Sequence, residues 1–513
     1  MDLSSLIERN AAFLPDKPAL RFEGETLSYA AFAARIEQTA RALSCELGVG
    51  PGDRVAILSL NRPDYLTLLY ACARLGAMLV PLNWRLATAE LLFILSDAAV
   101  KVLVLEQAFA EILPLLEKHL PETAIVGLDS VPLPERGTSF DVLLSRATGE
   151  ARDPQVDLIC PLLLVYTSGT TGRPKGAVLR QEALFWNGVM SQHMHDLTSD
   201  DHVLTVLPFF HVGGLNIQTT PALHLGATVT IHSRFTPANT LAAFERERPT
   251  LTVLVPATIQ AVTEHPAWAT TDLSSLKAIS TGSTIVPPQL IERFVARGVP
   301  VLQVYGATET CPIAVYTRLS GDLSREGSTG LPGLCCETAI IDDAGNELPA
   351  GTPGEIAVRG PNLFCEYWRN EPATRAALRN GWYRTGDIGR RDADGYYWVH
   401  DRKNNVIISG GENIYPGEVE RVLLEHPDVN ECGVIGRPDK RWDEVPIAYV
   451  IRKKGGQIGA DDLKAYVQSH LARFKVPREI IFVEDLPRTA LGKVQHFMLK
   501  QLDAGLLVQG DAI

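Results

Sequence analysis

Positive charge is scarce in this chain. Its 513 residues carry 48 Lys and Arg against 60 Asp and Glu, which leaves a net charge of −12. A protein that binds nucleic acid needs a positive field, so nucleic acid is not expected as a partner. If the protein binds phosphate groups, it has to do so through local interactions, such as those of backbone N–H groups, a bound cation or a few Lys and Arg side chains at the site.

Cysteine motifs and membrane signals are also lacking. The eight Cys residues are scattered, with no C-x-x-C pair and no Cys/His spacing suited to zinc, so we expect reduced thiols in a cytoplasmic protein. Residues 1–20 show neither the basic start nor the apolar run of a signal peptide. The longest apolar stretch, residues 66–80, contains Arg74 and is too short to span a bilayer. No integral membrane segment is expected.

The composition is that of a globular protein of several domains. Hydrophobic residues make up 46% and charged residues 21% of the chain, and its length suggests roughly three domain-sized units. Apolar strand patterns alternate with helical ones, of which residues 63–75 are the clearest. The strands are predicted at residues 53–60, 77–81, 101–105, 203–207, 228–232, 251–255 and 301–304. This alternation predicts an α/β fold with parallel sheets covered by helices.

The pattern changes in the last third of the chain. Residues 330–400 read as a β-rich module of short strands between turn clusters. A polar stretch at residues 401–405 follows, and beyond it a new α+β pattern begins. We therefore predict an N-terminal domain at residues 1–403 and a small, mobile α+β domain at residues 404–513.

The strongest chemical signal is the segment YTSGTTGRPKG at residues 166–176. A strand-like run precedes it and a helical pattern follows. Its glycines let the backbone fold around an oxyanion, its hydroxyls add donors, and Lys175 supplies a positive charge. Because Pro174 precedes that Lys and Gly176 follows it, the segment lacks the GK[ST] ending of a P-loop. It indicates a phosphate site of another kind.

This segment resembles the signature of the AMP-forming acyl-CoA synthetases, the superfamily that includes adenylation domains and luciferases. Further motifs follow in family order over nearly the whole chain. They are PFFHVGG (208–214), YGATET (305–310), GEI (354–356), YRTGD (383–387), SGGEN (409–413) and PRTALGK (487–493). The resemblance implies an ATP-dependent carboxylic acid:CoA ligase that forms an acyl-adenylate and then an acyl-CoA thioester.

The resemblance also implies the nucleotide site. Tyr305 is expected to stack on adenine, Thr308 to approach the α-phosphate, and Glu309 to hold Mg²⁺, a cation that prefers oxygen ligands. Asp387 is expected in a Gly-bearing turn, and its carboxylate suits a ribose cis-diol, because it accepts two donors at once. Arg402 is expected to reach the ribose or phosphate region. The ATP- and AMP-binding set implied by the resemblance is Thr167, Ser168, Gly169, Thr170, Thr171, Gly172, Lys175, Tyr305, Gly306, Thr308, Asp387 and Arg402, with Glu309 and Thr167 at the metal.

A mobile C-terminal domain is implied by the same resemblance. Lys493 is expected to bridge the attacking carboxylate and the α-phosphate during adenylation, where a cation offsets the repulsion of two anions. Asn404 lies at the family hinge, where relatives usually carry Asp or Lys. The coenzyme A channel is implied at Ser409, Gly410, Gly411 and Glu412.

The acyl pocket is defined least by the motifs. His211, which we expect at the end of an apolar strand, resembles the gate between the carboxylate site and the thiol channel, and with Lys493 it is one of the two expected catalytic residues. The pocket walls implied by the resemblance are Val212, Gly213, Gly282, Ser283 and Gln303, with Leu215, Ile217, Gln218 and Gly306 beside them. Since these positions contain no Lys or Arg to pair with a second carboxylate, we expect a monocarboxylic substrate, either a fatty acid or an aryl acid.

Two other functions remain as alternatives at this stage. One is an acyl-adenylating enzyme that loads the pantetheine of a carrier protein instead of free coenzyme A. The other is a non-catalytic nucleotide- or acyl-binding protein, which would be expected to have lost Glu309, Asp387 or Lys493. The expected ligands are ATP, Mg²⁺, coenzyme A and a small carboxylic acid, and a homodimer is one of the assemblies left open.

Overall fold

The computed structural model describes residues 1–149, 151, 155–167, 174–282, 286–409, 412–440, 442–488 and 494–505. The chain divides into two compact units, each of which is described by itself. The first comprises residues 1–283, 290–338 and 358–383, and the second comprises residues 284–289, 339–357 and 384–513.

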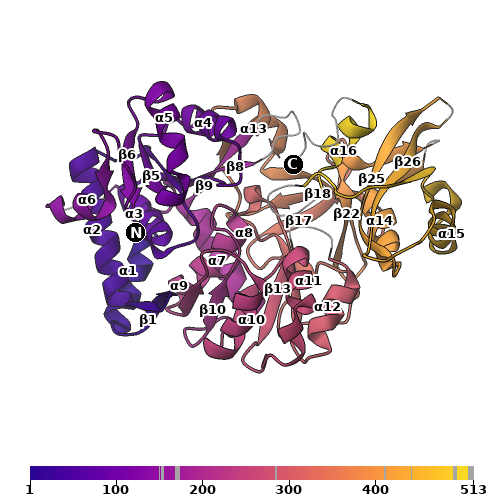
Figure 1. The fold of residues 1–513 in the computed structure, drawn as a ribbon, viewed down its shortest axis with the longest axis horizontal. Coiled ribbons are helices and arrows are strands. Elements are labelled where there is room, and N and C mark those ends of the chain that lie inside the picture. Colours follow the sequence, from indigo (N-terminus) through magenta and orange to yellow (C-terminus); the bar gives the residue numbers. More distant parts are fainter. Residues whose placement is uncertain are drawn as a thin grey trace. The chain divides into compact units, whose positions relative to one another are not determined.

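The first unit contains a sheet of nine described strands (Figure 1). In sheet order they are β16 (Leu331–Pro332), β15 (Val315–Tyr316), β14 (Val301–Tyr305), β13 (Ala278–Gly282), β12 (Leu251–Val253), β10 (His202–Thr205), β11 (Thr228–Ile231), β1 (Pro18–Phe22) and β2 (Glu25–Ser28). All pairs from β14 through to β1 are parallel. The carboxyl ends of these strands therefore lie at one edge of the sheet, where open α/β sheets bind ligands.

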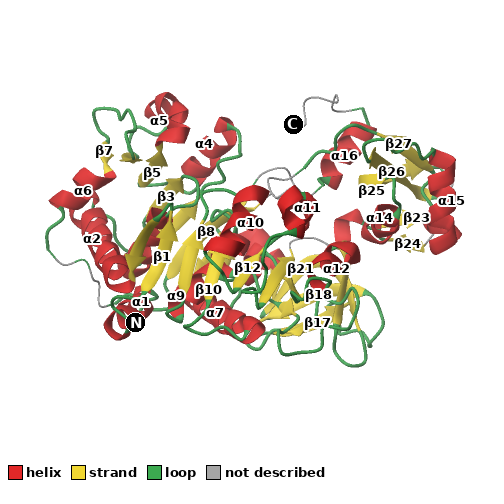
Figure 2. Ribbon diagram, turned by 60° about the horizontal axis from the view of Figure 1, so that its bottom comes forward, coloured by secondary structure: helices red, strands yellow, loops and turns green. Residues whose placement is uncertain are grey.

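A second sheet in this unit has eight described strands. In order they are β19 (Glu366–Tyr367), β9 (Lys175–Arg180), β8 (Pro161–Thr167), β4 (Met78–Pro81), β3 (Arg54–Leu58), β5 (Val102–Glu106), β6 (Ala124–Leu128) and β7 (Thr138–Ser139). The pairs from β8 to β7 are parallel, whereas β8 and β9 form an antiparallel pair. Figure 2 shows the strands in yellow among the red helices.

Helices connect and cover these strands, as the alternating pattern predicted. They are α1 (Ser4–Phe13), α2 (Tyr29–Leu47), α3 (Pro63–Leu75), α4 (Thr88–Asp97), α5 (Leu113–His119), α6 (Phe140–Arg146), α7 (Gln181–His195), α8 (Val212–Asn216), α9 (Thr219–His224), α10 (Pro237–Arg246), α11 (Pro256–Glu264), α12 (Pro288–Val295) and α13 (Glu371–Ala377), with 3₁₀ turns η1 (Gln107–Ile112), η2 (Pro266–Ala269) and η3 (Thr308–Thr310). The predicted fold class is confirmed for this unit.

The apolar stretch at residues 66–80 forms most of α3 and all but the last residue of β4, and it is buried throughout. Pro63 begins the helix, and Gly76 ends it in the left-handed conformation, with φ of 66°. Arg74 is only 1% exposed and is paired with Glu8 and Glu37, so its charge is compensated inside the unit. Among the described helices, none has the length and apolarity needed to cross a membrane.

The second unit consists of two groups of strands. The first comprises β17 (Glu337–Ile341), β18 (Gly354–Arg359), β21 (Trp382–Arg391) and β22 (Tyr397–Arg402), and one end of each of the first three falls in the first unit. The short strand β20 (Leu378–Arg379), which pairs with the start of β21, lies in the first unit. The second group comprises β23 (Ile407–Ser409), β24 (Glu412–Ile414), β25 (Val429–Asp439), β26 (Asp443–Arg452) and β27 (Glu479–Phe482). With them come α14 (Pro416–Glu425), α15 (Ala460–His470), α16 (His496–Asp503), η4 (Lys403–Asn405) and η5 (Arg473–Lys475).

The small α+β fold predicted for the C-terminal part is confirmed. Apolar residues of α14 and α15, including Val419, Leu423 and Leu463, pack with Val434 and Ala448 of the sheet. The expected domain division between residues 403 and 404 stays a prediction.

Candidate active site

The phosphate segment joins two antiparallel strands. Thr167 ends β8 and Lys175 begins β9, and the two residues are partners in the strand register. The Thr167 hydroxyl donates a long hydrogen bond of 3.5 Å to the Lys175 carbonyl. The Lys175 ammonium lies 5.6 Å from the ring centre of Tyr367, within cation–π range. Both ends of the predicted phosphate grip are thus fixed by a sheet.

Glu309 lies in η3, just after the carboxyl end of β14. It is only 7% exposed, and its Oε1 accepts a hydrogen bond of 2.7 Å from the hydroxyl of Tyr367. The bond fixes the carboxylate and leaves Oε2 without a hydrogen-bond or ion-pair partner among the described residues. Mg²⁺ in nucleotide sites takes one or two carboxylates together with substrate phosphates, so a fixed carboxylate oxygen here fits the ion.

The loop that carries Glu309 is held from a segment that lies about fifty residues further along the chain. Phe364 donates its backbone N–H to the Glu309 carbonyl at 2.8 Å. The Asn362 side chain donates to the carbonyls of Thr310 and Ile313 at 2.9 and 2.8 Å. These buried bonds stiffen the loop, which positions its carboxylate.

Two predicted glycines are required by close backbone approach. A Cβ on Gly306 would lie 1.7 Å from the carbonyl oxygen of Pro312, and a Cβ on Gly282 would lie 2.2 Å from that of Val304. Neither position accepts a side chain without backbone movement. Gln303 donates its amide to the Ser328 carbonyl at 3.0 Å, so this predicted wall residue is anchored at the strand.

His211 is placed differently from the prediction. It does not end a strand, because β10 stops at Thr205, and it is instead the residue before α8. The ring is buried against that of Phe210, and its Nε2 has no hydrogen-bond partner among the described residues. Burial, and to a smaller extent the charge of Arg85, lowers the pKa of His211 to about 3. The imidazole is therefore neutral.

A cluster beside His211 was missed by sequence reasoning. Arg85 stacks on the rings of Trp84 and Phe210, 4.8 and 5.9 Å from their centres, and Trp84 contacts Phe109 and Phe210. Burial lowers the pKa of Arg85. No motif marked the two residues at positions 84 and 85, because only the fold brings them to Phe210, more than a hundred residues later.

Asp387 belongs to the second unit and also departs from the prediction, because it lies within β21 and not in a turn. Its register partner in β22 is Arg402, whose Nε lies 2.9 Å from Oδ1 of Asp387. Asp387 is 7% exposed, and its N–H donates to the hydroxyl of Thr385 at 3.0 Å. The two residues predicted to reach the ribose are therefore neighbours in space.

Glu355, the central residue of the GEI motif, supports this strand pair, a role that the motif alone did not predict. Its Oε2 pairs with Arg384 at 2.8 Å, and its Oε1 accepts the Gly386 N–H at 3.1 Å. It is 6% exposed, so the pair is shielded from solvent. Lys403 also reaches Glu355, at 3.4 Å. A buried carboxylate thus ties the YRTGD segment to the start of the predicted hinge.

The predicted hinge is a short 3₁₀ turn, η4, that contains Asn404. Asp401 precedes it and accepts hydrogen bonds from the Asn405 side chain at 3.0 Å and from the Gly417 N–H at 2.7 Å. Burial, with a contribution from Glu420, raises the pKa of Asp401. The turn is consequently connected directly to α14.

The coenzyme A segment forms the ends of two short strands. Ser409 ends β23, Glu412 begins β24, and the two are register partners. Several predicted residues lie outside the described part of the chain. They are Ser168, Gly169, Thr170, Thr171, Gly172, Ser283, Gly410, Gly411 and Lys493.

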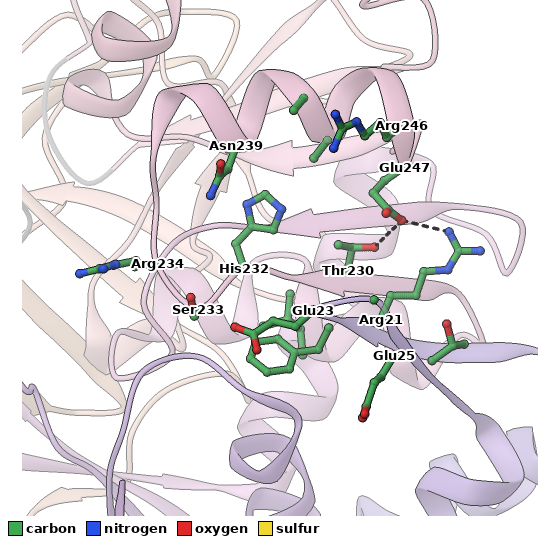
Figure 3. A pocket seen from close by; sticks show the side chains of 16 residues that line it. Arg21, Glu23, Glu25, Thr230, His232, Ser233, Arg234, Asn239, Arg246 and Glu247 are labelled. Carbon is green, nitrogen blue, oxygen red and sulfur yellow. Dashed lines mark hydrogen bonds and ion pairs between the residues drawn. The ribbon is translucent and has the colours of Figure 1, made fainter. Parts of the chain in front are cut away.

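A cavity of about 520 Å³ opens elsewhere in the first unit, between the β1–β2 hairpin, the end of β11 and α10. Figure 3 shows Arg21 and Glu247 paired with one another on its lining, 3.2 Å apart. Three arginines and three glutamates line the cavity, so its formal charges cancel. None of the predicted site residues is among its lining residues, which separates it from the nucleotide site.

Comparison with known proteins decides the family. A model described as AMP-binding enzyme matches residues 7–368, and one described as AMP-binding enzyme C-terminal domain matches residues 418–493. The chain belongs to the AMP-binding enzymes. It is an acid–thiol ligase of the AMP-forming type, as the motifs predicted.

Full-length relatives narrow the class of ligase. An indoleacetate–CoA ligase of Aromatoleum aromaticum is 48% identical, covering 98% of both chains. A feruloyl-CoA synthase of an Amycolatopsis species is 41% identical over 96% of this chain and 97% of its own. The solved o-succinylbenzoate coenzyme A synthetase of Bacillus subtilis, in complex with ATP and a magnesium ion, is 33% identical with a TM-score of 0.86, covering 98% of this chain and 99% of its own.

Proposed function

We propose that this AMP-binding enzyme activates an aromatic monocarboxylic acid, with indole-3-acetate as the first candidate, and transfers it to coenzyme A. The observation that carries the proposal is the 48% identity to an indoleacetate–CoA ligase over 98% of both chains. In the first half-reaction, a carboxylate oxygen of the acid attacks the α-phosphorus of ATP and pyrophosphate leaves. In the second, the thiolate of coenzyme A attacks the acyl carbon and AMP leaves.

The first unit supplies the groups for ATP. Thr167 and Lys175, at the two ends of the phosphate segment, hold the phosphates, and Tyr305 stacks on the base. Glu309, fixed by Tyr367, is the protein ligand of Mg²⁺, which neutralises phosphate charge when bound. The hydrogen bond and the burial of Glu309 support its role, because they hold its carboxylate in one orientation.

The second unit supplies the ribose contacts and the bridging cation. Asp387 accepts hydrogen bonds from the ribose hydroxyls, and Arg402, 2.9 Å away, orients its carboxylate. Lys493 bridges the carboxylate and the α-phosphate in the adenylation step. Rotation at Asn404 then exchanges Lys493 for the segment from Ser409 to Glu412, which admits the pantetheine.

The substrate is monocarboxylic because the pocket wall offers no cation for a second carboxylate. Val212, Gly213, Gly282 and Gln303 are apolar, small or neutral. The nearby Arg85 is engaged by two aromatic rings. A second carboxylate, as in o-succinylbenzoate, would be buried without a dedicated partner, at a cost of several kcal/mol. His211, neutral and buried, serves as the gate between the acid and the thiol.

The test is pyrophosphate release and thioester formation across a panel of acids, with coenzyme A and with a holo carrier protein as acceptors. Indole-3-acetate, phenylacetate and ferulate represent aryl acids, octanoate a fatty acid, and malonate and o-succinylbenzoate diacids. We expect the highest kcat/KM with an aryl monocarboxylate and free coenzyme A. Preference for octanoate or a diacid would contradict the substrate class, and turnover with the carrier protein alone would contradict the acceptor.

A further inference from the structure

Gln218 carries a buried acceptor that the protein leaves unused. The residue lies between α8 and α9 and is 1% exposed. Its Nε2 donates a hydrogen bond of 3.2 Å to the hydroxyl of Ser280 in β13. Its Oε1 has no hydrogen-bond partner among the described residues. A buried acceptor without a partner is uncommon in folded proteins, because the loss of its hydration is not compensated, so its presence here points to a ligand.

A chain of hydrogen bonds fixes which end of the amide is exposed to a ligand. His195 Nδ1 lies 2.8 Å from the Ser191 carbonyl, and because a carbonyl oxygen only accepts, Nδ1 is the donor in this bond. The Ser191 hydroxyl gives its own proton to the Ile217 carbonyl at 2.5 Å and is therefore not a donor to Nδ1. Burial lowers the pKa of His195 to about 4, and the neutral ring then accepts through Nε2 from the Ser280 hydroxyl at 2.7 Å. Ser280 has no second proton, so it accepts from the Gln218 NH₂ group.

This arrangement excludes the flipped amide. If Oε1 of Gln218 faced Ser280, the serine proton would have to serve both the glutamine and Nε2 of His195. The network therefore holds the carbonyl oxygen of Gln218 away from Ser280, as a fixed acceptor.

The residue that carries this acceptor lies beside residues of the predicted acyl pocket. Gln218 borders a cavity of about 10 Å³, room for roughly one water molecule, together with Gly214 and Thr219. Thr219 is already paired with Thr205 at 2.7 Å and with the Gly214 carbonyl at 2.9 Å, so these polar groups need no ligand. Val212 and Gly213, two predicted wall residues, lie in the same short helix α8 as Gly214.

Gln218 also contacts β13, a second element that carries a predicted wall residue. Its partner Ser280 is two residues before Gly282 in β13, and because side chains alternate along a strand, both positions face the same side of the sheet. Gln218 therefore adjoins two elements that carry predicted wall residues, α8, which ends two residues before it, and β13, whose Ser280 it contacts.

The same segment is tied to the loop of Glu309. Asn216 donates to the Sγ of Cys311 at 3.5 Å, and its carbonyl accepts from Asn187 at 2.6 Å. Asn187 in turn accepts the Ile313 N–H at 3.2 Å. An acceptor held rigidly relative to the reacting end of the substrate can set the position of the ring at its other end.

We propose that Gln218 selects aromatic acids that carry a hydrogen-bond donor on the ring, by accepting that hydrogen bond at Oε1, directly or through one water in the small cavity. The inference rests on the proposed function and narrows its substrate class. For indole-3-acetate the donor is the ring N–H. Sites built to bind a donor reject analogues that lack it strongly, because the acceptor is then left unpaired.

The test compares acids that differ only in the ring donor. We would measure kcat/KM for indole-3-acetate and for 1-benzothiophene-3-acetate, whose sulfur replaces the N–H, in wild type and Gln218→Met. The wild-type ratio is expected to exceed about thirtyfold, and Gln218→Met should bring it to within about threefold of one. The ratio does not depend on the fraction of folded enzyme, so a poorly folding variant still gives a valid result.

Gln181→Met is the matched control. Gln181 is also fully buried, but both ends of its amide are paired, with the Leu3 N–H at 2.8 Å and the Ala73 carbonyl at 2.9 Å. This control should keep the wild-type ratio. Ferulate and 3,4-dimethoxycinnamate form a second pair in which a phenol is the donor, and the same loss of preference in Gln218→Met would show that a phenol also uses this acceptor.

Failure of this inference differs from failure of the proposed function. If wild type forms the thioesters of both arylacetates with similar kcat/KM and shows no preference for ferulate, the function stands and the role of Gln218 is wrong. An unchanged ratio in Gln218→Met would also overturn that role. If no aromatic acid supports pyrophosphate release, the proposed function itself falls, and the role of Gln218 with it.

Discussion

The hydroxyl of Tyr367 lies 2.7 Å from Oε1 of Glu309, although 58 residues separate the two in the chain. This contact turns a carboxylate on a short loop into a fixed oxygen ligand, and the ring of Tyr367 also lies 5.6 Å from the ammonium of Lys175. One side chain therefore touches both the proposed magnesium ligand and the proposed phosphate cation.

Tyr367→Phe should weaken magnesium use without unfolding the enzyme. The substitution removes one hydrogen bond to a carboxylate, worth about 1.5–3 kcal/mol, so we expect kcat/KM at low Mg²⁺ to fall roughly tenfold or more, with partial recovery at high Mg²⁺. The control is Tyr316→Phe, which also removes a bonded hydroxyl, 2.9 Å from His193, but does not touch Glu309. An equal Mg²⁺ dependence in wild type and Tyr367→Phe would contradict this role.

Lys493→Ala should separate the two half-reactions. A cation that offsets the repulsion between a carboxylate and the α-phosphate acts only while the adenylate forms, so adenylation should fall by about a hundredfold or more. Thioester formation from supplied acyl-adenylate should fall much less. Lys500→Ala, in α16, is the control and should leave both steps near wild type. Equal loss in both half-reactions would refute the assignment.

The pair of Asp387 and Arg402 should behave as a unit toward ATP. Asp387→Asn and Arg402→Gln are each expected to raise the KM for ATP by roughly ten- to a hundredfold, since each disturbs a charge-assisted contact. The double variant should cost less than the product of the single effects, because the partners lie 2.9 Å apart. Fully additive effects would mean that Arg402 does not act through Asp387.

The pH profile should be independent of His211 near neutrality. Burial lowers the pKa of His211 from 6.5 to about 3, so the folded enzyme loses this proton far below neutral pH, and the ring is uncharged throughout the usual assay range. His211→Gln should change kcat but leave the position of the acidic limb between about pH 5.5 and 8 unchanged. A shift of that limb in His211→Gln would show that the ring titrates during turnover.

A proline at the proposed hinge should impair one half-reaction more than the other. Asn404 lies in η4, and a fixed φ at this position restricts the rotation by which one domain serves both steps. We expect Asn404→Pro to keep adenylation or thioester formation near wild type and to lose the other. Equal impairment of both, with an unchanged melting temperature, would indicate a plain linker.

Local pattern was enough to predict the helix over residues 63–75, where Pro63 and Gly76 mark its ends and apolar residues fill the interval. It was also enough for the strand that leads to Tyr305. The local pattern gave the wrong secondary structure at Asp387, where Gly386 suggested a turn and the structure has a strand. Gly386 adopts the left-handed conformation inside β21, with φ of 71°. The strand is paired on both sides of it, with β20 at residues 382–383 and with β22 at residues 387–391.

Motifs were enough to propose single site residues but not the residues that hold them in place. Glu309 and Asp387 could be predicted because each stands in a recognisable run. Tyr367 and Arg85 could not, because their contacts join segments far apart in sequence, and no local spacing encodes such contacts. The unpaired acceptor of Gln218 was equally hidden, since it depends on a hydrogen-bond network that crosses three elements.

The most direct test is isotope exchange between ATP and pyrophosphate, measured without coenzyme A and with indole-3-acetate as the only acid. Adenylate formation is reversible under these conditions, so the account predicts exchange that requires both the acid and Mg²⁺ and is lost in Lys493→Ala. Exchange with octanoate but not with indole-3-acetate, or no acid-dependent exchange at all, would contradict it.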